Sequence, residues 1–149
     1  MIVVNEVTLG KKPRQSLVDI SLSFKSGERC GLIGPPEAGK TVLLKIIAGL
    51  IRPASGSVSL EDTKLCHEDD LELSRWQRDV GMAFQNDALF DSMSVFDNVA
   101  FPLRRRGVSE PEIKDRVMGR LEDVGLGEAA LKYPGDISGG MRKRVGIAR

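Results

Sequence analysis

Residues 34–41 (GPPEAGKT) follow the pattern glycine, any four residues, glycine, lysine, then serine or threonine. Glycines at these spacings let a loop curl until its backbone N–H groups converge on phosphate oxygens. The lysine would reach the β- and γ-phosphates of a nucleotide, and the threonine hydroxyl would bind Mg²⁺. The loop therefore predicts a site for ATP and Mg²⁺. The residues expected to hold the nucleotide there are Gly34, Glu37, Ala38, Gly39, Lys40, Thr41 and Val42.

Three residues inside this loop depart from what phosphate binding favours. Pro35 and Pro36 have no N–H to donate, and Glu37 brings a negative charge close to the triphosphate. Either these features weaken nucleotide binding, or the side chains point away from the phosphates, and the sequence leaves both open. A chance glycine-rich turn with a surface lysine is the other interpretation. The context argues against it, because an apolar run precedes the loop and a helical pattern follows it.

A second short segment, residues 137–144 (ISGGMRKR), places a serine and two glycines where a helix is expected to begin. Hydroxyl and N–H groups at such a position could hold an anion. By itself, Ser138-Gly139-Gly140 could equally be a simple turn. Together with the first loop, it predicts composite sites, in which this segment of one molecule covers the nucleotide that another molecule holds.

The elements of the first half are predicted from hydrophobic periodicity and short apolar runs. Strands are expected at residues 2–9, 19–24, 30–33, 57–60 and 80–84, with 30–33 and 80–84 buried in a sheet. A nearly all-apolar run predicts a buried helix over residues 42–50. Residues 61–73 are polar and acidic and are expected to form a loop, with a short helix starting near Ser74.

After Gln85 the pattern becomes helical. A serine with an acidic residue three positions later, at 94 and 97 and again at 109 and 112, has the spacing of a helix start signal. Apolar residues then recur at helical intervals at positions 113, 117, 121 and 124, and Gly125 is expected to end that helix. Another helix is expected from Met141 onward.

Composition excludes several classes of protein. The 149 residues carry 22 Lys and Arg against 21 Asp and Glu, a net charge of +1, so a diffuse basic field for binding nucleic acid is not supported. Cys30 and Cys66 have no companion histidine cluster, which argues against zinc and disulfide frameworks and fits a reducing cytoplasm. No apolar stretch approaches the ~20 residues that span a bilayer.

The chain resembles the ATP-binding subunits of ABC transporters. GPPEAGKT is similar to the Walker A motif, Gln85 to the glutamine of the Q-loop, and ISGGM to the signature motif, in the family's order. The resemblance implies that Gln85, with Thr41, contacts Mg²⁺ near the nucleophilic water and relays the nucleotide state to a helical subdomain. It also implies that Ser138 and Gly140, with Gly139 between them, contact the γ-phosphate held by a partner subunit.

Details within these motifs narrow the resemblance. Met141 stands where the signature motif usually has glutamine, Val42 where many relatives have threonine, and residues 84–104 read FQNDALFDSMSVFDNVAFPLR. Together these resemble the Mla/MCE-type ATPases, which power phospholipid movement between bacterial membranes. The implied protein is a homodimer formed through its nucleotide sites, peripheral on the cytoplasmic face of a membrane permease, with phospholipid as the cargo.

The fold implied by the resemblance is α/β, a P-loop NTPase of the ABC ATPase type. It has an N-terminal antiparallel β subdomain and a helical signature subdomain, and the C-terminal part of the core sheet is expected to be missing. The expected divisions are residues 1–85 for the β subdomain and P-loop core and 86–141 for the helical subdomain. Residues 142–149 are expected to be the start of a truncated signature helix.

Two departures from the family's pattern lead to further expectations. Leu9 stands where an adenine-stacking aromatic is usual, which lowers the expected nucleotide affinity. No Walker B carboxylates or switch histidine follow the signature motif, and His67, the single histidine, precedes Gln85. The 149-residue chain alone is therefore expected to bind Mg·ATP weakly and to hydrolyse it at no useful rate. Strands missing from the core sheet would leave apolar faces of residues 30–33 and 42–50 uncovered, so the isolated chain is expected to be poorly soluble or molten.

Two other functions stay open on the sequence. One is a non-catalytic nucleotide-binding remnant or regulatory module, and the other is a non-transport ABC ATPase of DNA maintenance or translation. Leu89, Phe90 and Phe96, which follow Gln85, favour the transport type, because this region docks the membrane subunit in the resembled family. The same three residues could equally belong to a subdomain core.

Overall fold

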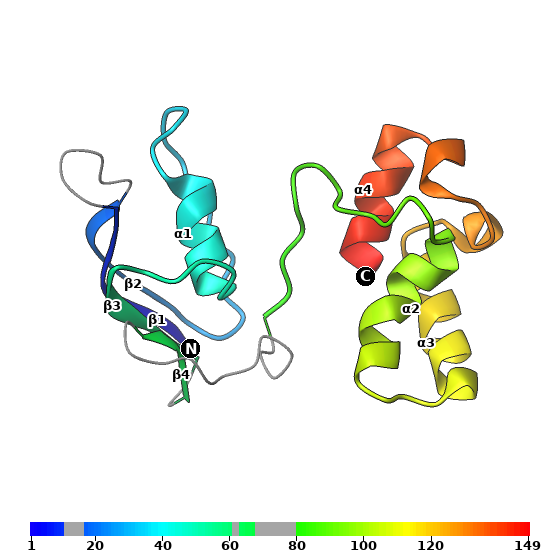
Figure 1. Ribbon diagram of the computed structural model, residues 1–149, viewed down its shortest axis with the longest axis horizontal. Coiled ribbons are helices and arrows are strands. Elements are labelled where there is room, and N and C mark those ends of the chain that lie inside the picture. Colours follow the sequence, from blue (N-terminus) through cyan, green and yellow to red (C-terminus); the bar gives the residue numbers. More distant parts are fainter. Residues whose placement is uncertain (11–16, 61–62, 68–79) are drawn as a thin grey trace. The chain divides into compact units, whose positions relative to one another are not determined.

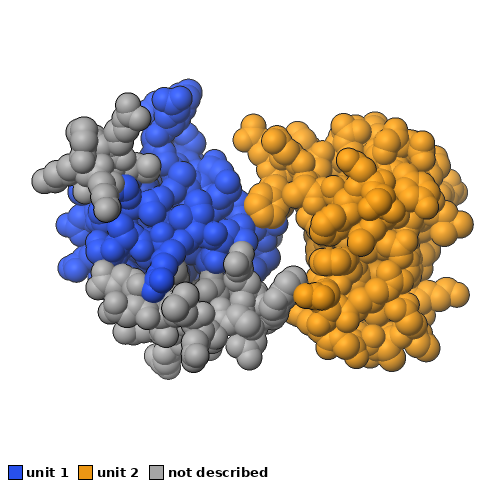
Figure 2. Space-filling view, in the orientation of Figure 1, with its two compact units in different colours: residues 1–82 blue, residues 83–149 orange. Residues whose placement is uncertain are grey.

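A computed structural model describes residues 1–10, 17–60, 63–67 and 80–149 of the chain (Figure 1). They belong to two compact units, Met1–Met82 and Ala83–Arg149, which Figure 2 shows in different colours. We call these unit 1 and unit 2. The short helix expected near Ser74 lies outside the described residues. The divisions expected at residues 85 and 141 stay predictions.

Unit 1 is built on a four-stranded antiparallel sheet. Its strands are β1 (Ile2–Leu9), β2 (Leu17–Phe24), β3 (Ser55–Leu60) and β4 (Thr63–His67), and their spatial order is β2-β1-β3-β4. Every neighbouring pair runs antiparallel. The antiparallel β subdomain predicted for the N-terminal part of the chain is confirmed.

Strand β4 corrects the prediction of a loop over residues 61–73. It pairs with β3, with Thr63 opposite Leu60 and His67 opposite Ser57. Pairing with a neighbouring strand satisfies backbone N–H and C=O groups whatever side chains are present. The polar composition of the segment therefore does not prevent it from forming a strand, because tertiary context outweighs β-propensity.

Helix α1 (Lys40–Ile47) packs on this sheet. The core of unit 1 draws residues from both, namely Val4, Val7, Leu17, Leu43, Ile46, Ile47 and Val58. The prediction of a helix in this region is correct, and its exposed Leu44, at 48%, agrees with the expectation that apolar surface of residues 42–50 stays uncovered in this chain. A short helix lying on one sheet buries a single stripe of side chains and leaves the opposite face open.

Two of the predicted strands, at residues 30–33 and 80–84, are not formed. No described strand pairs with either segment, and Ile33 is 94% exposed. A strand needs a neighbouring backbone to exchange hydrogen bonds with, so an apolar run without such a neighbour is not a strand. The phosphate loop is therefore preceded here by an open segment instead of a sheet strand.

Unit 2 is helical. Its elements are α2 (Val95–Arg105), α3 (Glu110–Asp123), the short 3₁₀ helices η1 (Gly127–Ala129) and η2 (Pro134–Asp136), and α4 (Gly139–Ala148). Helices α2 and α3 lie side by side, and α4 packs against both (Figure 1). One cluster of buried residues joins them: Val95, Val99, Ala100, Ile113, Val117, Leu121, Leu126, Ala129, Ala130, Ile137 and Val145. Within the described ranges, no helix has the length and apolar character needed to cross a membrane.

The helices of unit 2 begin and end at the predicted signals. Ser94 caps α2 by accepting a hydrogen bond from the N–H of Asp97 at 3.0 Å, and Ser109 is the N-cap residue of α3. Gly125, with φ 68°, follows α3 as expected for a residue that ends a helix. Helix α4 begins at Gly139 with Ser138 as its cap, as predicted for the serine and two glycines there, so its first turn starts two residues before Met141.

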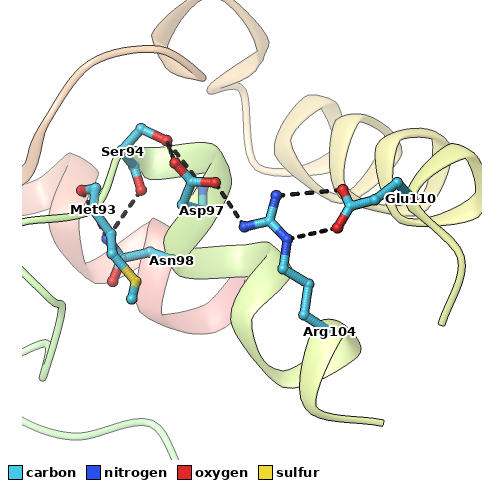
Figure 3. Close-up of polar contacts among 6 residues, drawn as sticks. All are labelled: Met93, Ser94, Asp97, Asn98, Arg104 and Glu110. Atoms are coloured by element: carbon cyan, nitrogen blue, oxygen red, sulfur yellow. Dashed lines mark hydrogen bonds and ion pairs between the residues drawn. The ribbon is translucent and has the colours of Figure 1, made fainter. Parts of the chain in front are cut away.

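A polar network joins the start of α2 to α3 (Figure 3). The Ser94 hydroxyl donates to the Asp97 carboxylate at 2.6 Å, and the Arg104 guanidinium binds Asp97 at 2.8 Å and Glu110 at 2.9 Å. The Ser94 hydrogen bond, and after it the Arg104 bond, lower the pKa of Asp97 below its usual value. Because the Asp97 and Arg104 side chains are each 40% exposed, this ion pair stabilises unit 2 only modestly.

Candidate nucleotide-binding site

The phosphate loop of unit 1 runs into the first turn of α1. Gly39 is the N-cap residue, with φ 85°, a left-handed conformation that glycine adopts without strain. The first backbone bond of the helix runs from the N–H of Leu43 to the carbonyl of Gly39 at 2.9 Å. The N–H groups of Lys40, Thr41 and Val42 therefore lie at the open end of the helix. Such an end attracts an anion.

The side chain of Lys40 folds back over the loop. Its Nζ donates to the carbonyl oxygen of Gly34 at 2.7 Å and to that of Pro35 at 2.6 Å. A lysine ammonium has three N–H donors, so one remains for a phosphate oxygen. The positive charge is thus held against the same loop that offers the open N–H groups, and both parts of a phosphate site come from residues 34–42.

The three unfavourable residues of the loop are accommodated in different ways. Pro35 cannot donate, yet its carbonyl accepts from Lys40 and, at 3.4 Å, from the N–H of Ala38. Glu37 has φ 64°, a left-handed conformation that costs a residue with a side chain about 1–2 kcal/mol. Pro36 and Glu37 are exposed. The Glu37 carboxylate is therefore solvated, and salt and water weaken its repulsion of a phosphate.

The three predicted signature residues form the start of α4 in unit 2. The Ser138 hydroxyl oxygen accepts a hydrogen bond from the N–H of Met141 at 3.3 Å. This cap leaves the N–H groups of Gly139 and Gly140 at the open end of the helix, and the hydroxyl still has a proton to donate. All three residues are exposed, whereas Ile137 before them is buried and ties the loop to the core.

Gln85 belongs to unit 2 and is exposed at the start of the segment that leads to α2. Gln85 and Thr41, the two residues predicted to bind Mg²⁺, offer an amide oxygen and a hydroxyl oxygen. Mg²⁺ takes oxygen ligands of this kind together with water and phosphate oxygens, so each residue type by itself is suited to a nucleotide-bound ion. Across the part of the chain that the structure describes, no group of three or more His, Cys, Asp or Glu side chains could hold a metal ion.

Asn98 is a positioning residue that the sequence analysis does not single out. It is fully buried in α2, and its amide nitrogen donates to the carbonyls of Phe90, Met93 and Ser94 at 3.0–3.1 Å. Its oxygen accepts from the N–H of Phe90 at 2.8 Å. The bonds to Met93 and Ser94 are drawn in Figure 3. The sequence signal for Asn98 is a polar residue on an otherwise apolar helix face, because a buried amide must find hydrogen-bond partners.

Comparison with known proteins gives a consistent result. A family model described as ABC transporter matches residues 17–149. The methionine import ATP-binding protein MetN of Carboxydothermus hydrogenoformans is 43% identical over 152 residues, covering 100% of this chain and 45% of the relative. The probable ribonucleotide transport ATP-binding protein mkl of Mycobacterium leprae is 46% identical over 132 residues, covering 88% of this chain and 38% of the relative. The chain therefore spans less than half the length of these curated relatives.

A solved structure is similar over nearly the whole chain. It is the ATP-binding cassette MJ0796, described as a dimer in a post-hydrolysis state bound to ADP and Pi. The TM-score is 0.87 at 28% sequence identity, and the match covers 99% of this chain and 68% of the cassette.

Proposed function

This chain belongs to the ABC transporter family and has the ABC ATPase fold, and on that premise we propose that it is the nucleotide-binding part of a transport ATPase. Unit 1 binds Mg·ATP through its phosphate loop. Unit 2 presents its signature loop to a nucleotide held by a second subunit. The observation that carries the proposal is the loop at residues 34–42, where open N–H groups and the Lys40 ammonium occur together.

In the proposed site, the triphosphate lies at the N-terminal end of α1. The backbone N–H groups of the first turn donate to phosphate oxygens, and Lys40 gives its remaining N–H to the β- or γ-phosphate. Mg²⁺, bound by Thr41 and Gln85 through their side-chain oxygens, would neutralise phosphate charge. These residues bind and orient the nucleotide, and electrostatic stabilisation of this kind is the main protein contribution to phosphoryl transfer.

The signature residues complete the site across a homodimer. The N–H groups of Gly139 and Gly140 and the Ser138 hydroxyl are donors suited to the γ-phosphate held by the other subunit. The dimeric state of the similar cassette supports this arrangement. Two nucleotides would then lie between the phosphate loop of one subunit and the signature loop of its partner.

Turnover also needs a group that takes a proton from the attacking water. The motifs of this chain supply the phosphate loop, a Mg²⁺ ligand and Gln85, and none of them is a carboxylate or histidine in that role. We therefore expect the 149-residue segment by itself to bind Mg·ATP and to hydrolyse it at no useful rate.

The transport part of the proposal rests on the family and on the region after Gln85. Leu89 and Phe96 pack against the core of unit 2, whereas Phe90 is 41% exposed and leaves apolar surface available to a membrane subunit. We place the protein on the cytoplasmic face of a membrane permease. The Mla/MCE-type motifs favour phospholipid as the cargo. Two relatives carry the names of methionine and ribonucleotide transporters, so those cargoes are the competing outcomes.

Titration with ATP and Mg²⁺ tests the binding function. Lys40→Ala removes the ammonium from the loop and should weaken ATP binding by at least about tenfold, the value of one charge-assisted contact. Lys45→Ala is the matched control, because it removes a lysine from the last turn of the same helix. Equal affinity of the two variants for ATP would contradict the proposed site.

A further inference from the structure

Unit 2 contains a hollow of about 550 Å³ that none of the proposed phosphate ligands lines. Its walls come from the C-terminal end of α3, from η1 and the residues beside it, and from the first turn of α4, which contributes Met141. Volumes of this order are typical of binding sites for small organic molecules. We call this feature the α3–α4 hollow.

The apolar part of the α3–α4 hollow is formed by Met118, Leu126 and Met141. Leu126 is only 2% exposed, and the two methionines are partly buried against the core of unit 2. Methionine side chains are flexible and carry a polarisable sulfur, so they adapt to aliphatic and aromatic groups of different shapes. These three residues therefore offer a surface for the apolar part of a ligand.

The charged part of the hollow consists of Glu122, Glu128 and Lys132, and all three residues are exposed. None of the ion pairs found within the described ranges involves them. Two carboxylates against one ammonium give the hollow a net negative charge. A ligand with a single positive charge would neutralise it.

Glu122 lies at the end of α3 that disfavours a carboxylate. The helix ends at Asp123, so Glu122 is in the last turn, where carbonyl oxygens without helical partners carry partial negative charge. This end of a helix repels a carboxylate and attracts a cation. A Cβ at Gly127 would lie 3.4 Å from Cγ of Glu122, so the Glu122 side chain passes close to the start of η1. The placement of Glu122 costs the helix stability and makes the hollow selective for positive charge.

We propose that the α3–α4 hollow binds a small organic cation, an ammonium group that carries an apolar chain or ring. The ammonium lies near Glu122 and Glu128, and the apolar group contacts the two methionines and Leu126. An inorganic cation would leave the apolar surface uncovered, and an anion with the same chain would meet two like charges. The lining residues all belong to unit 2, so this binding does not depend on the proposed ATP site.

Three probes with hexyl chains and different head groups test the proposal. The full-length protein, labelled with ¹³C in its methionine methyl groups, is titrated at pH 7 with hexylammonium, hexan-1-ol and hexanoate. Met118→Leu and Met141→Leu assign the two methyl signals that report on the hollow. The signals of Met82 and Met93, which do not line it, serve as internal controls.

We expect hexylammonium to shift the methyl signals of Met118 and Met141 with a Kd on the order of 1 mM, as suits a ligand of this size. Hexan-1-ol should bind at least about fivefold more weakly, and hexanoate more weakly still. Butylammonium should also bind at least about threefold more weakly than hexylammonium, because it buries less apolar surface.

Charge-neutral variants of the two glutamates locate the ammonium. Glu122→Gln and Glu128→Gln should each weaken hexylammonium binding about threefold, and together about tenfold. Asp123→Asn is the matched control, since it removes an equal charge from the neighbouring position of α3, which does not line the hollow. Its effect should stay below about 1.5-fold. Glu122→Gln should leave thermal stability unchanged or raise it, which separates lost binding from lost folding.

Equal affinity for the three hexyl probes would overturn the inference, and so would titrations that leave the Met118 and Met141 signals unshifted. Equal weakening by Glu122→Gln and Asp123→Asn would also overturn it, because the attraction would then be a general property of the charge of unit 2. ATP affinity measured on the same samples tests the proposed function separately, so failure of one leaves the other standing.

Discussion

The two helix starts that are proposed to meet phosphate are built in different ways. At α1, Gly39 provides no side-chain cap, the first-turn N–H groups stay open, and Lys40 is held against the loop by two backbone carbonyls. At α4, the Ser138 hydroxyl caps the N–H of Met141. The first start therefore has the donors and the cation to hold a phosphate by itself. The second has fewer open donors and suits a phosphate that is already held elsewhere.

The phosphate loop and the loop after Gln85 also differ in the residues that hold them in place. The phosphate loop of unit 1 is exposed. The two side-chain hydrogen bonds described within it are donated by Lys40, which is itself a proposed phosphate ligand. The loop after Gln85 is held by the buried Asn98 and by Arg142 and Arg149 of α4, none of which is a proposed phosphate ligand. A change in unit 1 should therefore alter binding more than stability, and a change in unit 2 should do the reverse.

The largest expected effect is loss of stability in unit 2 on replacing Asn98. Asn98→Ala removes four hydrogen bonds and leaves buried backbone groups without partners, which should lower the free energy of unfolding by about 3 kcal/mol. Lys40→Ala should change the stability of unit 1 by about 0.5 kcal/mol or less, because Lys40 bonds only exposed carbonyls. Hydrogen exchange of peptides from each unit measures both. Equal losses of unfolding free energy in Asn98→Ala and Lys40→Ala would contradict the difference proposed between the two units.

A smaller effect is expected at Glu37, where strain and charge can be separated. Glu37→Gly relieves the left-handed conformation and removes the negative charge, and we expect about threefold tighter ATP binding. Glu37→Gln removes the charge and keeps the strain, so it isolates the electrostatic part. That part should shrink as salt is raised, because the side chain is exposed. Binding titrations at two ionic strengths measure this, and weaker binding by both variants would assign Glu37 a favourable role instead.

Loss of the α4 cap should lower stability less than loss of Asn98 does, and it should not affect ATP binding by a single subunit. Ser138→Ala removes the hydrogen bond to Met141 and should cost about 1 kcal/mol in unit 2. ATP binding by dilute, monomeric protein should stay unchanged. Denaturant unfolding and a binding titration measure the two quantities. Weaker ATP binding by the monomer would mean that the second helix start contacts the nucleotide of its own subunit.

The smallest effect concerns pH. Since the folded-state pKa of Asp97 lies below its usual value, this carboxylate stabilises unit 2 above that usual value, and the stabilisation is lost as pH falls through the lowered pKa. Asp97→Asn should therefore flatten the decline of stability below about pH 4. Acid titrations of the two proteins, followed by helical circular dichroism, compare the slopes. Identical slopes would show that the Ser94 and Arg104 contacts are absent in solution.

The elements of unit 2 could be predicted because their signals are local. The Ser94 cap, the buried positions 113, 117 and 121, and Gly125 each lie within one or two helical turns of what they determine. Residues 30–33 and 80–84 were predicted as strands from apolar runs, but a strand depends on a partner that periodicity does not reveal. Strand β4 shows the converse, since pairing with β3 makes a strand of a polar segment.

The candidate site likewise contains residues that a local sequence pattern predicts and contacts that no local pattern predicts. The phosphate loop and signature residues are contiguous in sequence, so their residue types and spacing were enough to propose them. The contact of Arg149 with Ala88 joins residues 61 positions apart, and no short pattern predicts such a pair. Arg142 and Arg149 share a helix face by spacing alone, but the structure was needed to show that this face holds the loop after Gln85.

One mixing experiment tests the difference between the two helix starts most directly. Full-length Lys40→Ala and Ser138→Ala proteins are each assayed for ATP occluded per dimer, alone and after mixing in equal amounts. If each site takes its phosphate loop from one subunit and its signature loop from the other, a mixed dimer regains one intact site. Random pairing then restores about a quarter of the unaltered protein's occlusion. No gain over the separate variants would contradict the account, because it would place both helix starts in the site of a single subunit.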